Sequence, residues 1–422
     1  MPDPKTFAEK ALARAAKVED VRPGQIVDVY PDLCMSNTAS WRCVRTLEKL
    51  GTDDLYNPDR IAMVMDHISP ARTSKTAGDQ RLCREFAARK EIKKFYDVEA
   101  GIAHVVLMED GHVRPGMVVI GTDSHSTIYG ALGAFGTGVG YSEITAVWVT
   151  GALWMKVPES IRVVIEGPLA RGVSSKDVML KLIGDLTADG ATYCSVEFEG
   201  SYVEGLSISD RMTLCNLAME LGAKNAFVRP DAVTRAYLSE RGVTAGEYAE
   251  IHPDSGATYL KTVTLDGRAL IPQIACPHTV DNVKSIDEVA GTKVDQVFIG
   301  SCANAKYEDL VEAARILNGR KVAPGVRLLV SPASKQIVER IVRDGTYSIF
   351  LEAGALLTNP GCSACAGDGG VMADGEVTLS TANRNFQGRM GSYNAEIYLG
   401  SPAVAAATAI KGVVTDPREF LS

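Results

Sequence analysis

Short apolar runs alternate with longer amphipathic segments in the last third of the chain. Residues 294–300 (VDQVFIG) and 326–332 (VRLLVSP) have the composition of buried strands, whereas residues 307–317 and 334–345 have the periodicity of helices. This alternation predicts a parallel sheet with helices packed on it. Ligands of such sheets bind beyond the carboxyl ends of the strands, and Cys302 lies where the first strand gives way to a helix.

The length of the chain predicts more than one hydrophobic core. A chain of 422 residues exceeds the size at which single cores stop growing. The pattern of strands and helices breaks at Pro158 and again near Ser285. We therefore expect three α/β domains with parallel or mixed sheets flanked by helices, at residues 1–158, 159–284 and 285–422.

Composition and charge restrict the class of protein. Hydrophobic residues make up 46% of the chain and charged residues 23%, which is typical of globular proteins. No apolar run approaches the roughly 20 residues of a membrane-spanning helix. The first 20 residues predict a short amphipathic helix and lack the apolar core of a signal peptide. With a net charge of -8, these features predict a cytoplasmic protein that binds neither membranes nor nucleic acid.

Three of the cysteines have a spacing and context typical of metal ligands. Cys362 and Cys365 form a C-x-x-C pair in a glycine-rich loop, and Cys302 occupies the strand-to-helix switch. Three thiolates are one fewer than a [4Fe–4S] cluster normally takes, which leaves one iron open to water or substrate. An open iron can act as a Lewis acid.

Two other interpretations of these cysteines stay open. A C-x-x-C pair also serves zinc and redox chemistry, and zinc would need a fourth ligand, for which His278 is a candidate. The other six of the nine cysteines show no ligand spacing, so we interpret them as interior residues.

Two clusters of Asp and His are candidates for proton transfer. Asp66 precedes His67, and Asp123 and His125 flank a serine in a segment predicted to run from a buried strand (117–120) through a glycine-rich loop into an apolar helix. A carboxylate beside an imidazole fixes the tautomer of the ring and raises its basicity. An isolated Asp-His pair is more often structural, so these residues alone do not predict an enzyme.

A third cluster is cationic. Arg384 and Arg389 lie in the segment NRNFQGR, which is predicted to be irregular. Guanidinium groups bind carboxylates through two parallel hydrogen bonds. Without other evidence, two exposed surface arginines would be the simpler interpretation.

Taken in order, the motifs DH, H, DSH, N-x-x-x-E, GSC-x-N, CxxC and NRNFxGR resemble the aconitase superfamily along nearly the whole chain. The segments 113–140, 298–310 and 380–392 are most similar to its two-subunit branch, which contains the isopropylmalate dehydratases. The resemblance implies a three-domain body with a [4Fe–4S] cluster. It also implies that the swivelling fourth domain is absent and that a separate small subunit replaces it, so that the chain is inactive alone.

The resemblance assigns roles to individual residues. It implies that Cys302, Cys362 and Cys365 are the cluster ligands, flanked by Ser301 and Asn304. The implied catalytic residues are Asp66, His67, His104, Asp123, His125 and Glu220. The implied substrate-binding residues are Ser124, Asn216, Arg384 and Arg389.

The implied reaction is the reversible dehydration and rehydration of a hydroxy dicarboxylic acid, with 2-isopropylmalate to 3-isopropylmalate in leucine biosynthesis as the favoured case. His67 would give a proton to the departing hydroxyl, and a serine of the small subunit would take the carbon-bound proton. Ser36, Asn37 and Thr38 depart from the pattern of isopropylmalate enzymes, as does the segment 66–75, and are candidates for a change of substrate. Homoaconitate, dimethylmalate and citramalate-type substrates stay open, as do an apo-form RNA-binding regulator and a zinc-binding structural protein.

Overall fold

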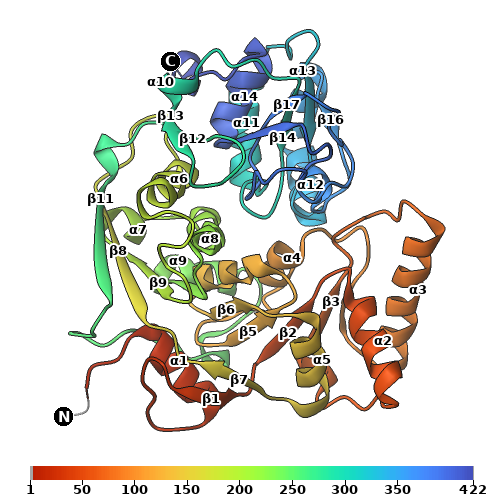
Figure 1. The fold of residues 1–422 in the computed structure, drawn as a ribbon, viewed down its shortest axis with the longest axis vertical. Coiled ribbons are helices and arrows are strands. Elements are labelled where there is room, and N and C mark those ends of the chain that lie inside the picture. Colours follow the sequence, from red (N-terminus) through yellow and green to blue (C-terminus); the bar gives the residue numbers. More distant parts are fainter. Residues whose placement is uncertain (1–2, 422) are drawn as a thin grey trace.

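Strands and helices alternate along most of the chain in the computed structural model, which describes residues 3–421 (Figure 1). Within the described residues, the strands form three large sheets and one two-stranded ribbon, β1 with β7. The predicted N-terminal helix is present as α1 (Phe7–Ala16). No helix among residues 3–421 is long and apolar enough to span a membrane.

The first sheet has the strand order β4-β3-β2-β5-β6 and is parallel throughout. Its strands and the ribbon are β1 (Ile26–Val29), β2 (Leu33–Ser36), β3 (Ile61–Val64), β4 (Lys94–Tyr96), β5 (Val118–Gly121), β6 (Phe135–Gly138) and β7 (Leu153–Lys156). The helices are α2 (Ser40–Leu50), α3 (Ser74–Arg89), α4 (Ala103–Glu109), α5 (Tyr141–Thr150) and the 3-10 helices η1 (Pro58–Arg60) and η2 (Ser124–Leu132).

The glycine-rich segment that precedes α5 differs from its prediction as a loop. Residues Phe135–Gly138 form strand β6, which pairs with β5. The backbone of η2 crosses this strand so closely that a Cβ on Gly136 would lie 2.2 Å from the carbonyl oxygen of Ser126. The glycine therefore serves close packing of a strand and not the flexibility of a loop.

The second sheet, β10-β9-β8-β11, is also parallel. The predicted helix at its start is α6, with Ser174 as the N-cap in a capping box with Asp177. The elements are β8 (Ser160–Glu166), α6 (Ser175–Leu186), β9 (Ser195–Glu199), α7 (Ser201–Glu204), α8 (Ile208–Leu217), η3 (Ala218–Leu221), β10 (Asn225–Val228), α9 (Ala232–Ser239), η4 (Ala245–Glu247), β11 (Lys261–Asp266) and η5 (Gly267–Ala269).

The third sheet has the order β13-β12-β18-β17-β14-β15-β16 and is mixed, because β12 pairs antiparallel with both neighbours. Its strands are β12 (Gln273–Ala275), β13 (Val283–Ser285), β14 (Gln296–Ile299), β15 (Arg327–Val330), β16 (Leu356–Leu357), β17 (Val377–Ser380) and β18 (Glu396–Leu399). The helices are α10 (Ile286–Val289), α11 (Tyr307–Leu317), α12 (Lys335–Arg343), α13 (Thr346–Ala353), α14 (Pro402–Lys411), η6 (Ser363–Ala366) and η7 (Pro417–Phe420). The predicted parallel strand pair is confirmed as β14 and β15, and the predicted helices as α11 and α12.

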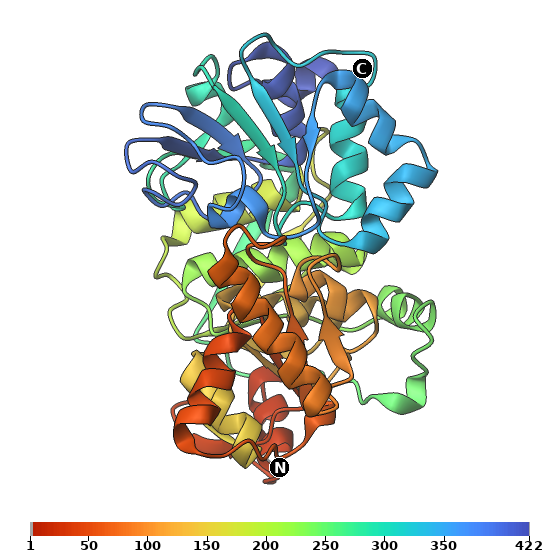
Figure 2. The ribbon, with the colours of Figure 1, turned by 90° about the vertical axis from the view of Figure 1, so that its right-hand side faces the viewer.

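The described residues form two hydrophobic cores, as the length of the chain predicted: one spans the three sheets, and the other packs against the first sheet and includes Met63, Ile120 and Trp148. A single cluster of buried side chains includes Met35 of the first sheet, Val163 of the second and Val297 of the third. Figure 2 shows the C-terminal segment stacked on the N-terminal one, with helices of the middle segment between them. The predicted domain boundaries stay a prediction; β12 and β13, which lie before or at residue 285, pair within the third sheet.

Candidate active site

A cavity of about 1080 Å³ opens at the carboxyl end of the first sheet. The residues that follow β2, β3, β5 and β6 line it, which is the edge at which parallel α/β sheets bind ligands. Lys224 of the middle segment and Arg384 and Arg389 of the last segment complete the wall. All three parts of the chain therefore contribute to this cavity.

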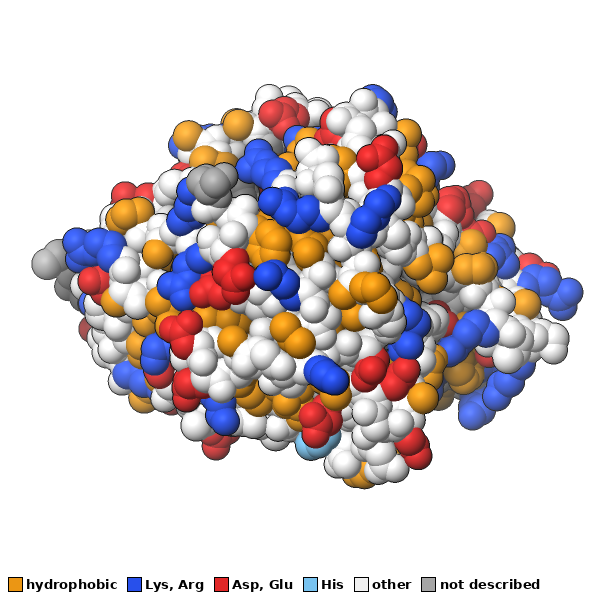
Figure 3. All heavy atoms as spheres, turned by 90° about the horizontal axis from the view of Figure 1, so that it is seen from above, with side chains coloured by type: hydrophobic (Ala, Val, Ile, Leu, Met, Phe, Trp, Pro, Cys, Tyr) orange, Lys and Arg blue, Asp and Glu red, His pale blue; other side chains and the backbone are white. Residues whose placement is uncertain are grey.

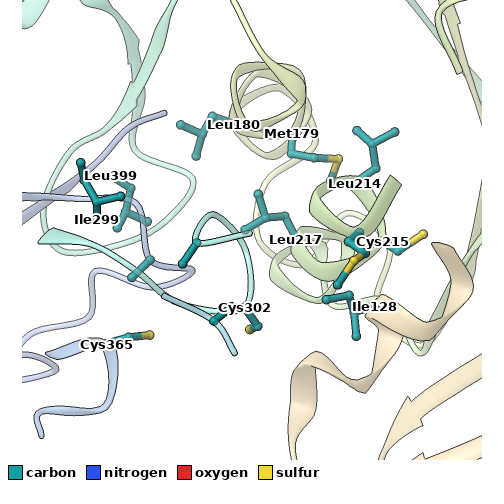
Figure 4. Close-up of a cluster of buried hydrophobic side chains, with 14 of the residues drawn as sticks. Ile128, Met179, Leu180, Leu214, Cys215, Leu217, Ile299, Cys302, Cys365 and Leu399 are labelled. Atoms are coloured by element: carbon teal, nitrogen blue, oxygen red, sulfur yellow. The ribbon is translucent and has the colours of Figure 1, made fainter. Parts of the chain in front are cut away.

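The three predicted ligand cysteines lie close together although two loops carry them. Cys302 follows β14, and Cys362 and Cys365 flank the first residues of η6. All three are free and buried, with exposed fractions of 4%, 7% and 4%. Burial raises the pKa of the Cys302 thiol, and the nearby charges of Cys362 and Cys365 raise it further. Figure 4 shows the side chain of Cys365 pointing toward the loop that carries Cys302.

Two asparagine side chains hold the sulfur of Cys302. Asn216, near the end of α8, donates its Nδ2–H to Cys302 Sγ at 3.1 Å. Asn383 donates to the same sulfur at 3.6 Å and also contacts the Oδ1 of Asn216. Both amides are buried. Hydrogen bonds of this kind stabilise the thiolate form, which is the form that binds metal.

Asp66 and His67 form a pair at the end of β3. The His67 Nδ1 lies 2.7 Å from Asp66 Oδ1, and the other carboxylate oxygen accepts the backbone N–H of Ala103 at 3.0 Å. The Asp66 carbonyl accepts the N–H of Cys362 at 3.1 Å, which ties this pair to the cysteine loop. Burial lowers the pKa of His67, but Cys362 and Asp66 outweigh it and hold the pKa well above its usual range.

A second chain of polar groups crosses from the first segment to the other two. His104 Nε2 lies 3.1 Å from Asp123 Oδ1, and His125 Nδ1 lies 3.4 Å from the same oxygen. His125 Nε2 lies 2.8 Å from Glu220 Oε1, which also accepts the Nε–H of Arg384 at 2.8 Å. Five predicted site residues thus form one continuous network.

The network fixes the charge of its members. Burial opposes ionisation of Asp123, but hydrogen bonds from His104 and His125 hold its pKa well below the usual range. The pKa of His125 is lowered by burial and raised by a larger combined effect of Asp123 and Glu220, so that it ends above its ordinary value. Ionised carboxylates between imidazoles are suited to orient the rings and to pass protons along them.

Arg389 lies beside the cysteines and carries an unused donor. Its guanidinium interacts with Cys365. Burial lowers the pKa of this guanidinium, but the charges of Cys365 and Cys362 outweigh burial and raise the pKa. Its Nε is buried without a hydrogen-bond partner among the described residues. Between positions 3 and 421, no three His, Cys, Asp or Glu side chains converge closely enough for a single metal ion. Three buried thiols that act on one another electrostatically, with an unpaired donor beside them, match the cysteine ligands and the hydrogen bonds to sulfur of an iron–sulfur cluster.

The remaining predicted residues divide between the cavity and the interior. Ser124, Asn37 and Thr38 line the cavity, and Thr38 Oγ1 accepts the backbone N–H of His67 at 2.6 Å. Ser36 is buried and bonds to the first helical residue of α2, so it lies outside the cavity wall. His278, the zinc candidate, is exposed and does not line the cavity.

Sequence reasoning missed Lys176, which supports the site from behind. Its fully buried Nζ donates to the carbonyl oxygens of Thr381 and Ala382 at 3.1 and 2.6 Å, directly before Asn383 and Arg384. Burial lowers its pKa to about 8. The sequence signal for this residue was its place on the apolar face of the predicted helix. A lysine that is buried there needs a partner, because lysines are almost never fully buried without one.

Comparison with known proteins agrees with the motifs. The 3-isopropylmalate dehydratase large subunit 1 of Methanopyrus kandleri is 47% identical over 419 residues, which cover 99% of this chain and 100% of that protein. The probable methanogen homoaconitase large subunit of Methanosarcina mazei is 47% identical over 378 residues, covering 89% of this chain and 95% of that protein. The 3-isopropylmalate dehydratase large subunit 2 of Archaeoglobus fulgidus is 44% identical over 419 residues, covering 99% and 100%.

The family model described as "Aconitase family (aconitate hydratase)" matches residues 10–292 and 286–412. The predicted resemblance and the predicted α/β class of fold are both confirmed. By its motifs, by the match of the family model to nearly all its length and by its full-length relatives, this chain belongs to the aconitase family.

Proposed function

We propose that this chain is the large subunit of a hydro-lyase that isomerises a hydroxy polycarboxylic acid by dehydration and rehydration. The observation that carries the proposal is that His67, Asp123, His125, Arg384 and Arg389 line one cavity, while the buried thiols of Cys362 and Cys365 interact with two of these residues, His67 and Arg389. The relatives are named as large subunits of dehydratases or homoaconitases, which supports both the reaction class and the need for a small subunit.

Cys302, Cys362 and Cys365 would hold a [4Fe–4S] cluster. When bound, the cluster supplies a Lewis-acidic iron without a cysteine ligand. Asn216 and Asn383 position the first sulfur. The unpaired Nε–H of Arg389 is available as a donor on the same side of the cavity.

His67 gives the proton that lets the substrate hydroxyl depart as water. Asp66 engages Nδ1 of the ring, so Nε2 is the nitrogen that would donate to the substrate; the ring also interacts with the thiol of Cys362, which the cluster would take up. The carboxylate also stabilises the protonated ring before transfer. In the rehydration step the same nitrogen takes a proton back from the attacking water.

Arg384 and Ser124 bind a carboxylate of the substrate. Both line the cavity, and Arg384 is oriented by its ion pair with Glu220. The network through His125 and Asp123 keeps this pair in one geometry. The group that removes the carbon-bound proton is assigned to a serine of the small subunit.

Two candidate substrates follow from the relatives. A relative named as a 3-isopropylmalate dehydratase large subunit and one named as a methanogen homoaconitase large subunit are both 47% identical to this chain. Leucine biosynthesis is therefore one assignment of the pathway and not the only one.

The RNA-binding alternative has less support. A nucleic-acid site gathers basic side chains on one face. On the face above the third sheet, Lys and Arg side chains are interspersed with Asp and Glu (Figure 3).

The proposal is tested with the complex of large and small subunits, prepared without oxygen. Cys365→Ser is expected to lose the visible absorption of the cluster and at least about 100-fold in kcat, because one ligand is lost. Cys194→Ser is the matched control, since this other buried cysteine lies at a loop end with only a carbonyl contact. Full activity of Cys365→Ser would contradict the open-cluster mechanism.

A further inference from the structure

The cavity wall includes a cationic residue and two aromatic residues that the proposed chemistry does not use. Arg42, in the first turn of α2, lies with its guanidinium carbon 5.3 Å from the ring centre of Trp41 and 5.2 Å from that of Tyr141. All three residues line the cavity. Two aromatic rings thus hold one guanidinium in place, an arrangement that pre-organises it for an anion.

Tyr141 connects this wall to the catalytic groups. Burial raises the pKa of its phenol, and the charges of Arg42, His67 and Asp123 all act on it. The phenol of Tyr141 is therefore near enough to Arg42, His67 and Asp123 for their charges to act on it, and all four residues line the same cavity.

The charges on the cavity wall do not balance. Five cations and two carboxylates line it: Arg42, Lys75, Lys224, Arg384 and Arg389, against Asp79 and Asp123. Arg384 is paired with Glu220, and Asp123 with histidines. In the described part of the chain, neither Arg42 nor Lys75 forms an ion pair or a side-chain hydrogen bond, so the positive charge of this wall is unmatched.

We infer that Arg42, held between Trp41 and Tyr141, determines specificity by binding a carboxylate on the variable side chain of the substrate. This inference rests on the proposed function and names its substrate class: a hydroxy tricarboxylic acid, in preference to a dicarboxylic acid with an alkyl side chain. Arg384 and Ser124 serve a carboxylate at the reacting carbons and Arg389 lies beside the cluster cysteines, which leaves Arg42 for a further anionic group. Arg42 is exposed in this chain, so water solvates its guanidinium. An alkyl group at this wall would displace that water without supplying a counter-charge, which costs binding free energy.

The test measures kcat and KM of the assembled complex for 2-isopropylmalate and for the hydroxy tricarboxylates citrate and homocitrate, which differ by one methylene. The wild-type complex is expected to have a higher kcat/KM for a tricarboxylate than for 2-isopropylmalate. Arg42→Gln removes the charge and keeps a polar side chain. It is expected to raise the KM for the tricarboxylate by about 10- to 100-fold, the effect of one lost charge-assisted hydrogen bond, with a smaller effect on 2-isopropylmalate.

Arg45→Gln is the matched control. Arg45 lies on the same helix, pairs with Glu48 at 3.2 Å and does not line the cavity, so its loss should leave both KM values within about twofold. The inference would be overturned, and the proposed function left intact, if the wild-type complex had the higher kcat/KM for 2-isopropylmalate. The same would follow if Arg42→Gln raised the KM for 2-isopropylmalate and for the tricarboxylates equally. A complex that dehydrates none of these three acids, and neither citramalate nor 2,3-dimethylmalate, would overturn both.

Discussion

Lys176 illustrates how one residue outside the cavity can decide whether the site forms. Replacing it with Met removes both hydrogen bonds to the segment that carries Asn383 and Arg384. It also removes a buried charge, so the two effects on the free energy of unfolding oppose each other. We expect Lys176→Met to change that free energy by less than about 2 kcal/mol while lowering kcat and cluster content by more than about tenfold.

Lys181→Met provides the control for this prediction. Lys181 lies on the same helix, is half-buried and forms an ion pair with Asp185. Cluster content is followed by visible absorption and stability by thermal unfolding. Equal cluster content in Lys176→Met and wild type would show that the hydrogen bonds of Lys176 do not support the site.

At the same scale, the sequence predicted side chains that carry chemistry better than those that position them. Cys302, Cys362 and Cys365 have a recognisable spacing, and the structure brings them together. Lys176 and the contacts of Asn383 depend on which distant loop packs against them. Such pairings are properties of the tertiary structure and leave no local pattern in the sequence.

At the scale of elements, Gly130 sets the distance between η2 and β10. A Cβ at this position would lie 1.8 Å from the carbonyl oxygen of Ala226, a backbone atom that cannot rotate away. Gly130→Ala is therefore expected to lower the free energy of unfolding by about 1–3 kcal/mol and to displace His125, which η2 carries. Thermal unfolding and kcat are the measurements.

The comparison variant is Gly78→Ala in the middle of α3, where an added Cβ meets nothing within 4 Å. Because alanine has the higher helix propensity, this change should stabilise the protein by about 0.5–1 kcal/mol. If Gly130→Ala proved as stable as Gly78→Ala, the close approach of η2 and β10 would not constrain the fold.

Strand β9 carries a carboxylate that makes stability depend on pH. Glu197 accepts the backbone N–H of Phe7 at 3.0 Å and the hydroxyl of Tyr259 at 2.9 Å, and burial raises its pKa to about 7. Between the ordinary pKa of about 4.3 and 7, the folded state holds a proton that the unfolded state has lost. The free energy of unfolding therefore falls as pH rises through this window.

Glu197→Gln is uncharged at every pH and keeps the shape of the protonated acid. As the pH rises from 4.5 to 8, the free energy of unfolding of Glu197→Gln should increase by about 3 kcal/mol relative to that of wild type. Urea unfolding at each pH measures it. Glu199→Gln is the control, because Glu199 lies on the same strand and its carboxylate is exposed. Parallel pH curves for wild type and Glu197→Gln would refute the prediction.

The elements also show where sequence patterns lose information. The periodicity of residues 307–317 and 334–345 predicted α11 and α12, because a helix that packs on a sheet must carry an apolar stripe. Strand β6 was missed because its glycines are selected by the close approach of η2. Composition alone cannot separate that requirement from a flexible loop.

At the scale of the whole molecule, the site exists only because three sheets meet. His67 and His125 come from the first segment, Glu220 from the second and the three cysteines from the third. The motifs predicted this set of residues but not the distances among them, which depend on how the sheets pack. The cavity remains wide at about 1080 Å³, which leaves room for a partner to supply the missing base.

The central claim is that three cysteines of this chain hold a cluster with one iron open to substrate. Mössbauer spectroscopy of the assembled complex, reconstituted with ⁵⁷Fe and measured with and without a hydroxy acid, tests it most directly. A cluster held by three cysteines should contain iron and sulfide in equal amounts, and one of its four irons alone should change its spectrum when substrate is added. Four irons that all stay unchanged, or zinc bound without sulfide, would contradict it.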